Sequence, residues 1–398
     1  MSLGNEGFFI YMTNNEKTII SITGASHLLV HSLMLTLPSL IPLIQDEFNV
    51  GIDTLGFVVS ISALFFGLGA IPAGWIDRYV GKKRLLMIYQ LGSAVSALMV
   101  VFSPNFFSLV LGLSFMGLFC SIYHPTGLTL ISQRVSNVSK GMAIHGMFGS
   151  MGSALGPLSA VLIAALFSWR YSYLFLGLLN IILFVITFFS ISSSSEIKNK
   201  INNNLKVKTN VPALIYYFIT NSFLGMAYYG FTTFMPIHLS TNTNEFLPVI
   251  SENLKAGLFP TLVFFAGMIG ALIGGKIGNR FDKKLSFMTI IIINIPIFFL
   301  VGESANFSLI LFSIMLGIVY FSNQPIGNTL VSEFTDNTNR GFIYGLGFFI
   351  SFGIGSFAAG LSGIVAVNFG VSAVFPFMGL LLLPGVAFAW MMYRASFK

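Results

Sequence analysis

The stretch from Gly117 to Gln133, GLFCSIYHPTGLTLISQ, recurs in edited form from Gly317 to Glu333 as GIVYFSNQPIGNTLVSE. Six of its positions are identical at a constant offset. They are Gly117/Gly317, Pro125/Pro325, Gly127/Gly327, Thr129/Thr329, Leu130/Leu330 and Ser132/Ser332. At the centre His124 corresponds to Gln324, so one copy carries a group that takes up a proton and the other does not. The repeat predicts a chain built from two related halves.

The composition excludes a soluble globular protein. Of 398 residues, 55% are hydrophobic and 8% are charged, whereas roughly a quarter of the residues are charged in soluble domains. We therefore expect an all-α polytopic membrane protein with the lipid bilayer as its surroundings. One cysteine, Cys120, leaves no disulfide framework and no thiol metal cluster. The net charge of +7 comes from loops between apolar stretches, so no nucleic-acid role follows from it.

The apolar stretches predict twelve transmembrane helices, because about 20 apolar residues suffice to cross a bilayer. Their expected limits are 18–43, 54–76, 85–103, 107–133, 142–167, 171–193, 213–237, 257–279, 285–301, 307–333, 342–367 and 371–393. A run rich in Ser, Asn and Lys predicts a cytoplasmic linker at 194–212 between six-helix halves at 1–193 and 213–398. Repeated halves of this kind are typical of transporters whose substrate site lies near the midplane between them.

The basic residues predict the orientation of the helices. All but Arg170 and Lys255 of the 20 Lys and Arg residues fall at the chain ends or in even-numbered loops. Loops rich in Lys and Arg stay in the cytoplasm. Both termini are therefore predicted to be cytoplasmic, and we expect a monomer in a bacterial inner membrane.

The chain resembles the major facilitator superfamily over nearly its whole length. The superfamily signature after the second helix, G-x-x-x-D-R-x-G-R/K-R/K, is matched except that its acidic and basic pair stands one position early. In the fifth helix the chain matches G-x-x-x-G-P, the start of a motif associated with antiporters. The resemblance implies the major facilitator fold, with two pseudo-symmetric six-helix halves, and gating roles for residues of these two motifs, the shifted acidic and basic pair included. These are Asp77, Arg78, Gly81, Lys82, Lys83, Gly152, Gly156 and Pro157.

Three segments are similar to a narrower group, the fosmidomycin-resistance exporters. They are SHLLVHSLMLTLPSLIP (Ser26 to Pro42), SIYHPTG in the fourth helix and GMAIHGMFGSMGSALGPL in the fifth. The group commonly has an acidic residue where this chain has His31. The resemblance implies export of a small organic compound by antiport, but it does not identify the compound.

Four histidines in the first half are the predicted proton carriers: His27, His31, His124 and His145. The helical rise places His27 and His124 roughly 14 Å, and His31 roughly 20 Å, from the cytoplasmic ends of their helices. The expected spans hold no Asp, Glu, Lys or Arg away from their ends. Imidazole titrates near neutral pH without a large perturbation, so we expect the histidines to couple transport to protons.

The same histidines allow another interpretation. His27 and His31 lie on one face of a helix, and with His124 they would supply three nitrogen ligands for a transition metal. The protein would then import or export a metal or a metal chelate. An enzyme using His124 as general base is disfavoured, because no acid or nucleophile in the spans would orient it. A sensor that does not transport is a further alternative, and no cofactor is expected.

The expected substrate contacts combine histidines with uncharged polar groups. They are His27, His31, Tyr123, His124, Asn221, Tyr228, Tyr229, Asn323 and Gln324. No arginine within the spans would clamp a phosphate in bidentate fashion. We therefore expect a neutral or mono-anionic, partly apolar small-molecule substrate.

Overall fold

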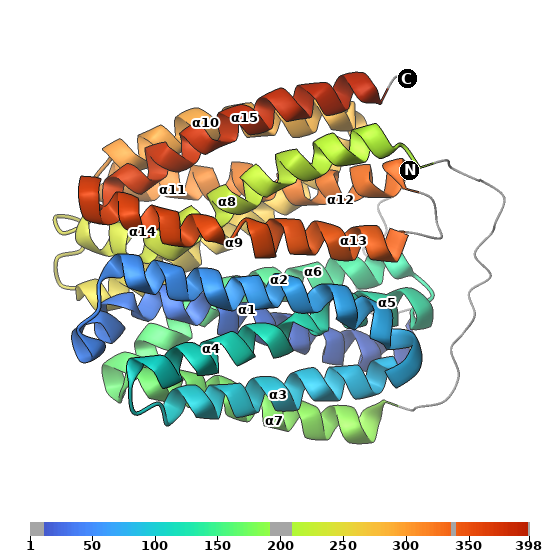
Figure 1. Ribbon diagram of the computed structural model, residues 1–398, viewed down its shortest axis with the longest axis horizontal. Helices are drawn as coiled ribbons and strands as arrows, with labels where there is room; N and C mark the ends of the chain where they lie inside the picture. The colour runs from blue at the N-terminus through green and yellow to red at the C-terminus, as the bar shows by residue number, and fades with distance from the viewer. Residues whose placement is uncertain (1–11, 192–208, 336–339, 397–398) are drawn as a thin grey trace, which may run out of the picture.

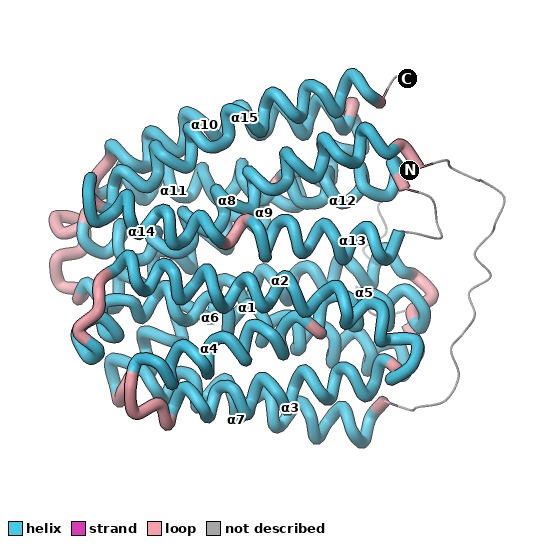
Figure 2. Tube along the Cα trace, in the orientation of Figure 1, coloured by secondary structure: helices cyan, strands magenta, loops and turns pink. Residues whose placement is uncertain are grey.

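The structure is a computed structural model that describes residues 12–191, 209–335 and 340–396. Throughout these residues it is a bundle of long helices without strands. Figure 2 shows that the helices run side by side and are joined by short loops at the two ends of the molecule. The all-α fold class predicted from the sequence is confirmed.

The helices form two groups. The first contains α1 (Asn14–Phe48), α2 (Ile52–Val80), α3 (Lys82–Val101), α4 (Phe106–Ser121), α5 (Tyr123–Arg134), α6 (Val138–Leu166) and α7 (Trp169–Ser190). The second contains α8 (Val211–Thr241), α9 (Glu252–Arg280), α10 (Lys283–Glu303), α11 (Asn306–Phe321), α12 (Asn323–Phe334), α13 (Arg340–Phe348), a π-helical turn (Phe349–Ile354), α14 (Phe357–Phe369), a short 3-10 turn (Val371–Ala373) and α15 (Val374–Ala395).

The two groups occupy different halves of the molecule in Figure 1. Two hydrophobic clusters fill them, one built mainly from α1–α7 and one mainly from α8–α15. Most of the expected linker at 194–212 lies outside the described residues. The division at 1–193 and 213–398 therefore stays a prediction.

Eleven spans in the described part of the chain are long and apolar enough to cross a membrane. The remaining long helix is α8, which has 31 residues and no charged side chain. Its Tyr, Thr, Ser and Asn residues keep it below the mean hydropathy of the others. Together with α8, the eleven spans agree with the twelve helices expected from the sequence.

Most helices begin before the expected limits of the spans, and several also end beyond them. The first span was expected at 18–43, whereas α1 begins at Asn14 and ends at Phe48. The Thr13 hydroxyl accepts a hydrogen bond from the Glu16 amide at 3.2 Å, and the Glu16 carboxylate accepts one from the Thr13 amide at 2.8 Å. Such a capping box extends a helix with polar residues, which a search for apolar length does not count.

The fourth and tenth spans are each interrupted, although both were expected to be continuous. The breaks fall at Ile122, between α4 and α5, and at Ser322, between α11 and α12. Each break precedes a proline of the sequence repeat, Pro125 or Pro325. A proline lacks the amide hydrogen for the carbonyl four residues earlier, and its ring crowds that carbonyl. The eleventh span is also divided, by the π-helical turn between α13 and α14.

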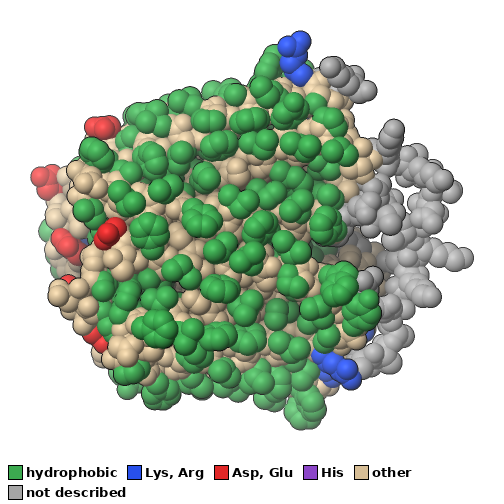
Figure 3. Space-filling model, viewed as in Figure 1, with side chains coloured by type: hydrophobic (Ala, Val, Ile, Leu, Met, Phe, Trp, Pro, Cys, Tyr) green, Lys and Arg blue, Asp and Glu red, His purple; other side chains and the backbone are tan. Residues whose placement is uncertain are grey.

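Charge distinguishes the two ends of the bundle. The start of α1 and the end of α15 lie at the same end, which we call the basic face (Figure 1). In the view of Figure 3, Lys and Arg side chains lie at this end and Asp and Glu at the opposite end, the acidic face. The surface between them is covered with hydrophobic side chains, as a protein surrounded by lipid requires.

The two helix groups contact each other closely near the acidic face. The Ser60 hydroxyl of α2 donates to the Ser356 carbonyl at 2.5 Å, and the Ser356 hydroxyl donates back to the Ser60 carbonyl at 3.1 Å. The Thr261 hydroxyl of α9 donates to the Ala154 carbonyl of α6 at 2.7 Å. These hydrogen bonds hold the acidic side of the interface shut.

Candidate functional site

A cavity of about 220 Å³ lies between the two helix groups. Helices α1 and α6 line one side, and the second group lines the other. Gly146, Gln324 and Asn328 on its walls are exposed. Their helices lead to the basic face, so the cavity is open on that side and closed toward the acidic face. No Asp, Glu, Lys or Arg is among the described residues that line it.

Small residues form the α6 wall. Gly146, Gly149, Ser150 and Ser153 line the cavity, and their spacing places them on one helix face. A Cβ atom at Gly146 would meet nothing within 4 Å, whereas one at Gly149 would collide with the His27 imidazole. Gly149 therefore makes room for His27, and Gly146 leaves open space at the wall.

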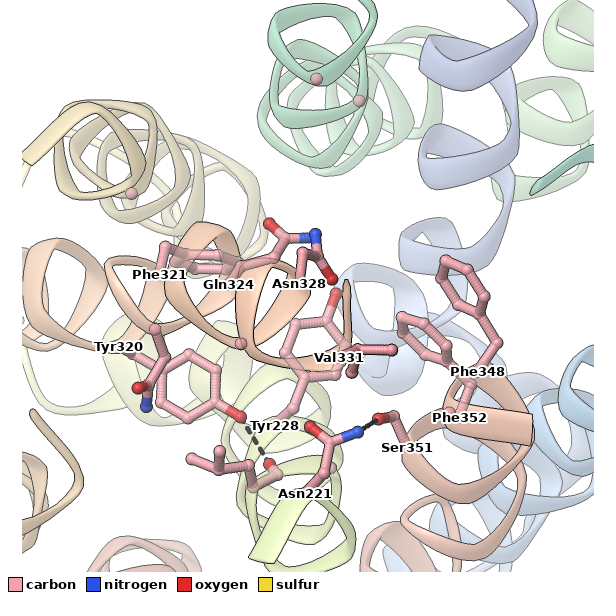
Figure 4. Close-up of a pocket in the computed structure, with 18 of the residues that line it drawn as sticks. Asn221, Tyr228, Tyr320, Phe321, Gln324, Asn328, Val331, Phe348, Ser351 and Phe352 are labelled. Atoms are coloured by element: carbon pink, nitrogen blue, oxygen red, sulfur yellow. Dashed lines mark hydrogen bonds between the residues drawn. The ribbon is translucent and has the colours of Figure 1, made fainter. Parts of the chain in front are cut away.

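Amide side chains dominate the opposite wall. Asn221 comes from α8, and Asn323, Gln324 and Asn328 come from α12. Figure 4 shows Gln324 and Asn328 together on α12 and Asn221 donating to the Ser351 hydroxyl. That hydrogen bond is 2.5 Å long. The wall offers hydrogen-bond donors and acceptors without a formal charge.

Aromatic rings complete this wall. Tyr228, Tyr320, Phe348 and Phe352 line the cavity, as Figure 4 shows. The Tyr320 hydroxyl donates to the Leu224 carbonyl at 2.5 Å, which fixes its ring. Aromatic side chains with a few placed polar groups are the usual lining of small-molecule sites.

Two of the predicted histidines, His27 and His31, form a hydrogen-bonded pair at the α1 wall. His27 Nδ1 lies 2.8 Å from the His145 carbonyl, which only accepts, so this nitrogen carries the hydrogen. In the neutral form His27 Nε2 is therefore an acceptor, and His31 Nε2, 3.1 Å away, donates to it. The remaining acceptor of this pair is His31 Nδ1.

His124 lies behind this pair rather than on the cavity lining. Its ring centroid is 5.1 Å from that of His27 and 5.5 Å from that of His31. Phe348, which lines the cavity, lies 5.1 Å from it on the other side. His124 Nδ1 is buried without a hydrogen-bond partner in the described structure. Nitrogens of His27, His31 and His124 lie within 4.8 Å of one another.

Tyr123 and His145 form a second layer around His27. The Tyr123 hydroxyl donates to the Thr23 carbonyl, so it accepts from His145 Nδ1 at 3.1 Å. The rings of His145 and His27 stack with centroids 4.0 Å apart. Tyr123, one of the expected substrate contacts, is not on the lining of this cavity but bonds to His145 behind it, and its contact with substrate stays a prediction.

The structure brings together six of the nine expected substrate contacts on the cavity lining: His27, His31, Asn221, Tyr228, Asn323 and Gln324. The other three are Tyr123, His124 and Tyr229. Tyr229 lines a separate, small cavity beside Ser62 and Leu113. The fifth histidine, His238, bonds through Nε2 to the Val301 carbonyl at 3.0 Å, far along α8.

Sequence reasoning missed the α6 wall, Asn328 and Ser351. A signal was present for the first two, because Gly146, Gly149, Ser150 and Ser153 follow a helical face and Asn328 stands one turn after Gln324. Ser351 had no such signal. It faces Asn221 because of how the π-helical turn packs against α8.

The expected gating residues lie at helix ends and helix contacts. Gly81 precedes α3 with φ of 82°, a conformation that glycine adopts readily, and Lys83 Nζ donates to the Phe188 carbonyl at 2.7 Å. Lys82 begins α3, and the side chains of Asp77 and Arg78 lie outside the described part.

Cβ atoms at Gly152 and Gly156 would overlap the α1 backbone, so these glycines allow α1 and α6 to pack closely. Pro157 follows them in α6. Gating by these residues stays a prediction.

Comparison with known protein families identifies the class of protein that this fold and cavity define. The model of the Major Facilitator Superfamily matches residues 23–345 and 239–397. The chain belongs to this superfamily of membrane transporters. It is thus an integral membrane protein of a transporter family, as predicted, while the narrower resemblance to the fosmidomycin-resistance group stays a prediction.

Two curated relatives are similar to parts of the chain. An uncharacterized MFS-type transporter of Bacillus subtilis, YtbD, is 27% identical over 300 residues, which cover 72% of each protein. The quinolone resistance protein NorB of Staphylococcus aureus is 28% identical over 167 residues, or 42% of this chain and 35% of NorB.

Solved structures show the same fold. A bacterial homolog of the human lysosomal transporter Spinster, in an inward-facing and occupied conformation, aligns with a TM-score of 0.78 and 13% identity. The alignment covers 96% of this chain and 98% of the homolog. A POT family transporter in complex with 5-aminolevulinic acid aligns with a TM-score of 0.77 and 12% identity, over 98% and 97% of the two chains.

Proposed function

We propose that this protein is a secondary active transporter that exports a small organic solute in exchange for protons, by alternating access. The observation that carries the proposal is the continuous cluster of His27, His31, His124 and His145, which runs from the cavity wall into the first helix group. The basic face is assigned to the cytoplasm, which makes this conformation inward-facing.

The hydrogen bonds of the cluster explain how a proton would change the conformational balance. A proton added to His27 Nε2 converts the acceptor of the His31 hydrogen bond into a donor. The pair then separates or reorients, and a positive charge appears at the cavity wall. A charge is costly away from water, so protonation favours the conformation that hydrates the cluster.

The direction of transport rests on sequence similarity. Gly152, Gly156 and Pro157 match the start of the antiporter motif, and one relative is a quinolone resistance protein. Both features favour export over import. Solute and proton would use the same cavity in turn, because its only described opening in this conformation leads to the basic face.

Proteoliposomes test the proposal. A thermal-stability screen that includes quinolones selects a solute, because a ligand that binds the folded state raises the melting temperature. We expect a pH gradient to drive its accumulation by the protein. His27→Gln, His31→Gln and His124→Gln should each abolish this accumulation, and His238→Gln serves as the control because His238 lies outside the cluster. Coupling that survives in all three folded variants would contradict the proposal.

A second candidate function uses the same nitrogens to bind a transition metal or its chelate. It is favoured by the 4.8 Å grouping of His27, His31 and His124 and by the unpartnered Nδ1 of His124. The residues present would form an open site, with room for a chelate in the cavity. Thermal stability that is unchanged across a panel of divalent metals, together with metal-independent transport, would exclude this function.

A further inference from the structure

Tyr229 is a side chain of the second helix group that packs inside the first. Its backbone belongs to α8, yet its ring, with the residue only 7% exposed, is part of the hydrophobic cluster built mainly from α1–α7. It borders the small cavity of about 20 Å³, and every other residue that lines this cavity comes from α1, α2 or α4. We call these residues the socket: Leu33, Met34, Leu37, Val59, Ser62, Ala63, Leu113 and Met116.

The socket offers Tyr229 apolar contact. Ser62 is the one socket residue with a hydroxyl, and that hydroxyl already donates to the Leu113 carbonyl at 2.9 Å. The others are Leu, Met, Val and Ala. An aromatic side chain stabilises a contact of this kind mainly through the area that its ring buries. The ring of Tyr229, rather than its hydroxyl, therefore holds α8 against the first helix group.

Tyr229 lies on the closed side of the large cavity. The residues of α8 that line this cavity end at Tyr228, and Tyr229 is the next residue toward the acidic face. Phe352, which lines the large cavity, lies 6.2 Å from Tyr229 between ring centroids. The α2 part of the socket surrounds Ser60, whose hydroxyl donates to the Ser356 carbonyl of the second group. The ring is thus buried where the two groups meet and the passage is shut.

Opening the acidic side separates the two helix groups. The backbone of Tyr229 moves with the second group, whereas the socket moves with the first. The ring must therefore leave the socket before the cavity can open toward the acidic face. Its withdrawal exposes an aromatic ring and an apolar surface, which is unfavourable in water. Burial of this ring favours the conformation in which the cavity opens to the basic face.

We propose that Tyr229 is a plug that keeps this protein inward-facing at rest, so that the solute is loaded from the basic face. The inference rests on the proposed transport function, whose resting conformation it assigns to one side chain. In this role Tyr229 contacts neither the solute nor the proton. It acts on the relative position of the two helix groups, and the balance between conformations should depend on its ring.

Two reporter cysteines on α6 measure which side of the interface is open. Ala154→Cys places a thiol at a position that is 0% exposed and packs in the second hydrophobic cluster, whereas Gly146→Cys places one at the open cavity wall. The native Cys120 is 0% exposed and gives no background. Each purified full-length protein is labelled with a small maleimide, without solute or gradient. We expect Gly146→Cys to react at least about tenfold faster, because a minor conformation is populated at about 10% or less.

Three substitutions of Tyr229 are then combined with each reporter. Tyr229→Ala should raise the Ala154→Cys rate relative to the Gly146→Cys rate at least about tenfold, on the scale that loss of a buried aromatic ring produces. Tyr229→Leu keeps a buried apolar group, so it should fold and shift the ratio in the same direction by a smaller factor. Tyr229→Phe should leave the ratio within about twofold, because it keeps the ring.

Phe231→Ala is the matched control. Phe231 is also in α8 and 0% exposed, but its ring packs against Phe298 and Tyr320 of its own helix group, with centroids 5.9 and 5.0 Å away. These contacts stay within one group when the interface opens. Phe231→Ala should therefore lower the melting temperature while the labelling ratio stays within about twofold of wild type.

The outcomes separate this inference from the proposed function. A ratio that is unchanged in Tyr229→Ala and Tyr229→Leu, or an equal shift in Phe231→Ala or Tyr229→Phe, would overturn the plug even if pH-driven transport is observed. A graded shift that follows the size of the side chain at position 229 supports it. If this shift occurs but no solute moves in proteoliposomes, the proposed function fails while the plug stands.

Discussion

The two broken helices, α4–α5 and α11–α12, share a backbone design and differ in their side chains. In both, a repeated proline follows the break. After the first break Tyr123 reaches the Thr23 carbonyl and His145, so its polar group is fully used. After the second, the shorter Asn323 has a buried side-chain amide without a hydrogen-bond partner, although the residue borders the cavity. The repeat thus sets the helix geometry, while the residues that follow each break differ in whether their polar groups are paired.

Replacing His124 by Gln makes the first break resemble the second, and this change has the largest expected effect. We expect pH-driven transport to fall by roughly 100-fold, the scale on which a positioned proton-transfer group acts. Binding of solute in the absence of a gradient should stay within about twofold, since His124 is not on the cavity lining. The reverse change, Gln324→His, should not restore coupling in this variant, because the supporting contacts of Tyr123 and His145 are missing around α12. Restored coupling would show that the side chain alone suffices.

The next largest effect is expected at α6, where an added Cβ should destabilise the protein at Gly149 but not at Gly146. Gly149→Ala should displace the His27 ring, which its Cβ would overlap, at a cost of about 1–3 kcal/mol in the free energy of unfolding. Transport should fall in parallel. Gly146→Ala is the matched control for stability, since a Cβ there meets nothing within 4 Å. Thermal unfolding of both variants checks this, and equal effects on the free energy of unfolding at the two positions would refute the placement of His27.

Removing the polar group that follows each break should affect stability in opposite ways. Tyr123→Phe deletes two hydrogen bonds and should lower the free energy of unfolding by about 1–2 kcal/mol. Asn323→Leu deletes no hydrogen bond in the absence of solute, so it should leave stability unchanged or increase it. Thermal unfolding of both variants without ligand measures the contrast. A large loss of stability from Asn323→Leu would reveal an internal partner for that amide.

The smallest effect is expected at the open edge of the cavity. Gln324→Ala removes an exposed amide, and we expect solute affinity to fall by about two- to tenfold, the value of one neutral hydrogen bond. Equilibrium titration of the solute measures this change, with Thr329→Ala on the same helix as a control outside the lining. An unchanged affinity would remove Gln324 from the substrate contacts.

The sequence predicted the features that depend on local pattern. Apolar length indicated the spans, and the repeat placed Asn323 and Gln324 on a cavity helix together with the histidines of the first half. The sequence did not show which way each side chain faces, because this depends on how the helices rotate and pack. Tyr123 and Tyr229 therefore turned out to lie behind the cavity wall, and Ser351 was missed. The prolines were visible, but the breaks that leave Asn323 without a partner became apparent only in the folded chain.

The low hydropathy of α8 has a consequence for how this protein is made. Asn221, Tyr217 and Tyr228 serve the cavity from this helix, and they make it the least suited of the spans to leave the translocon for lipid by itself. Its long contact with α15, the last helix in the described part of the chain, shields much of its surface in the folded protein. Stable integration of α8 is therefore expected to depend on helices that emerge after it. A chain shortened before α15 should be a target for membrane quality control even though every residue of α8 is present.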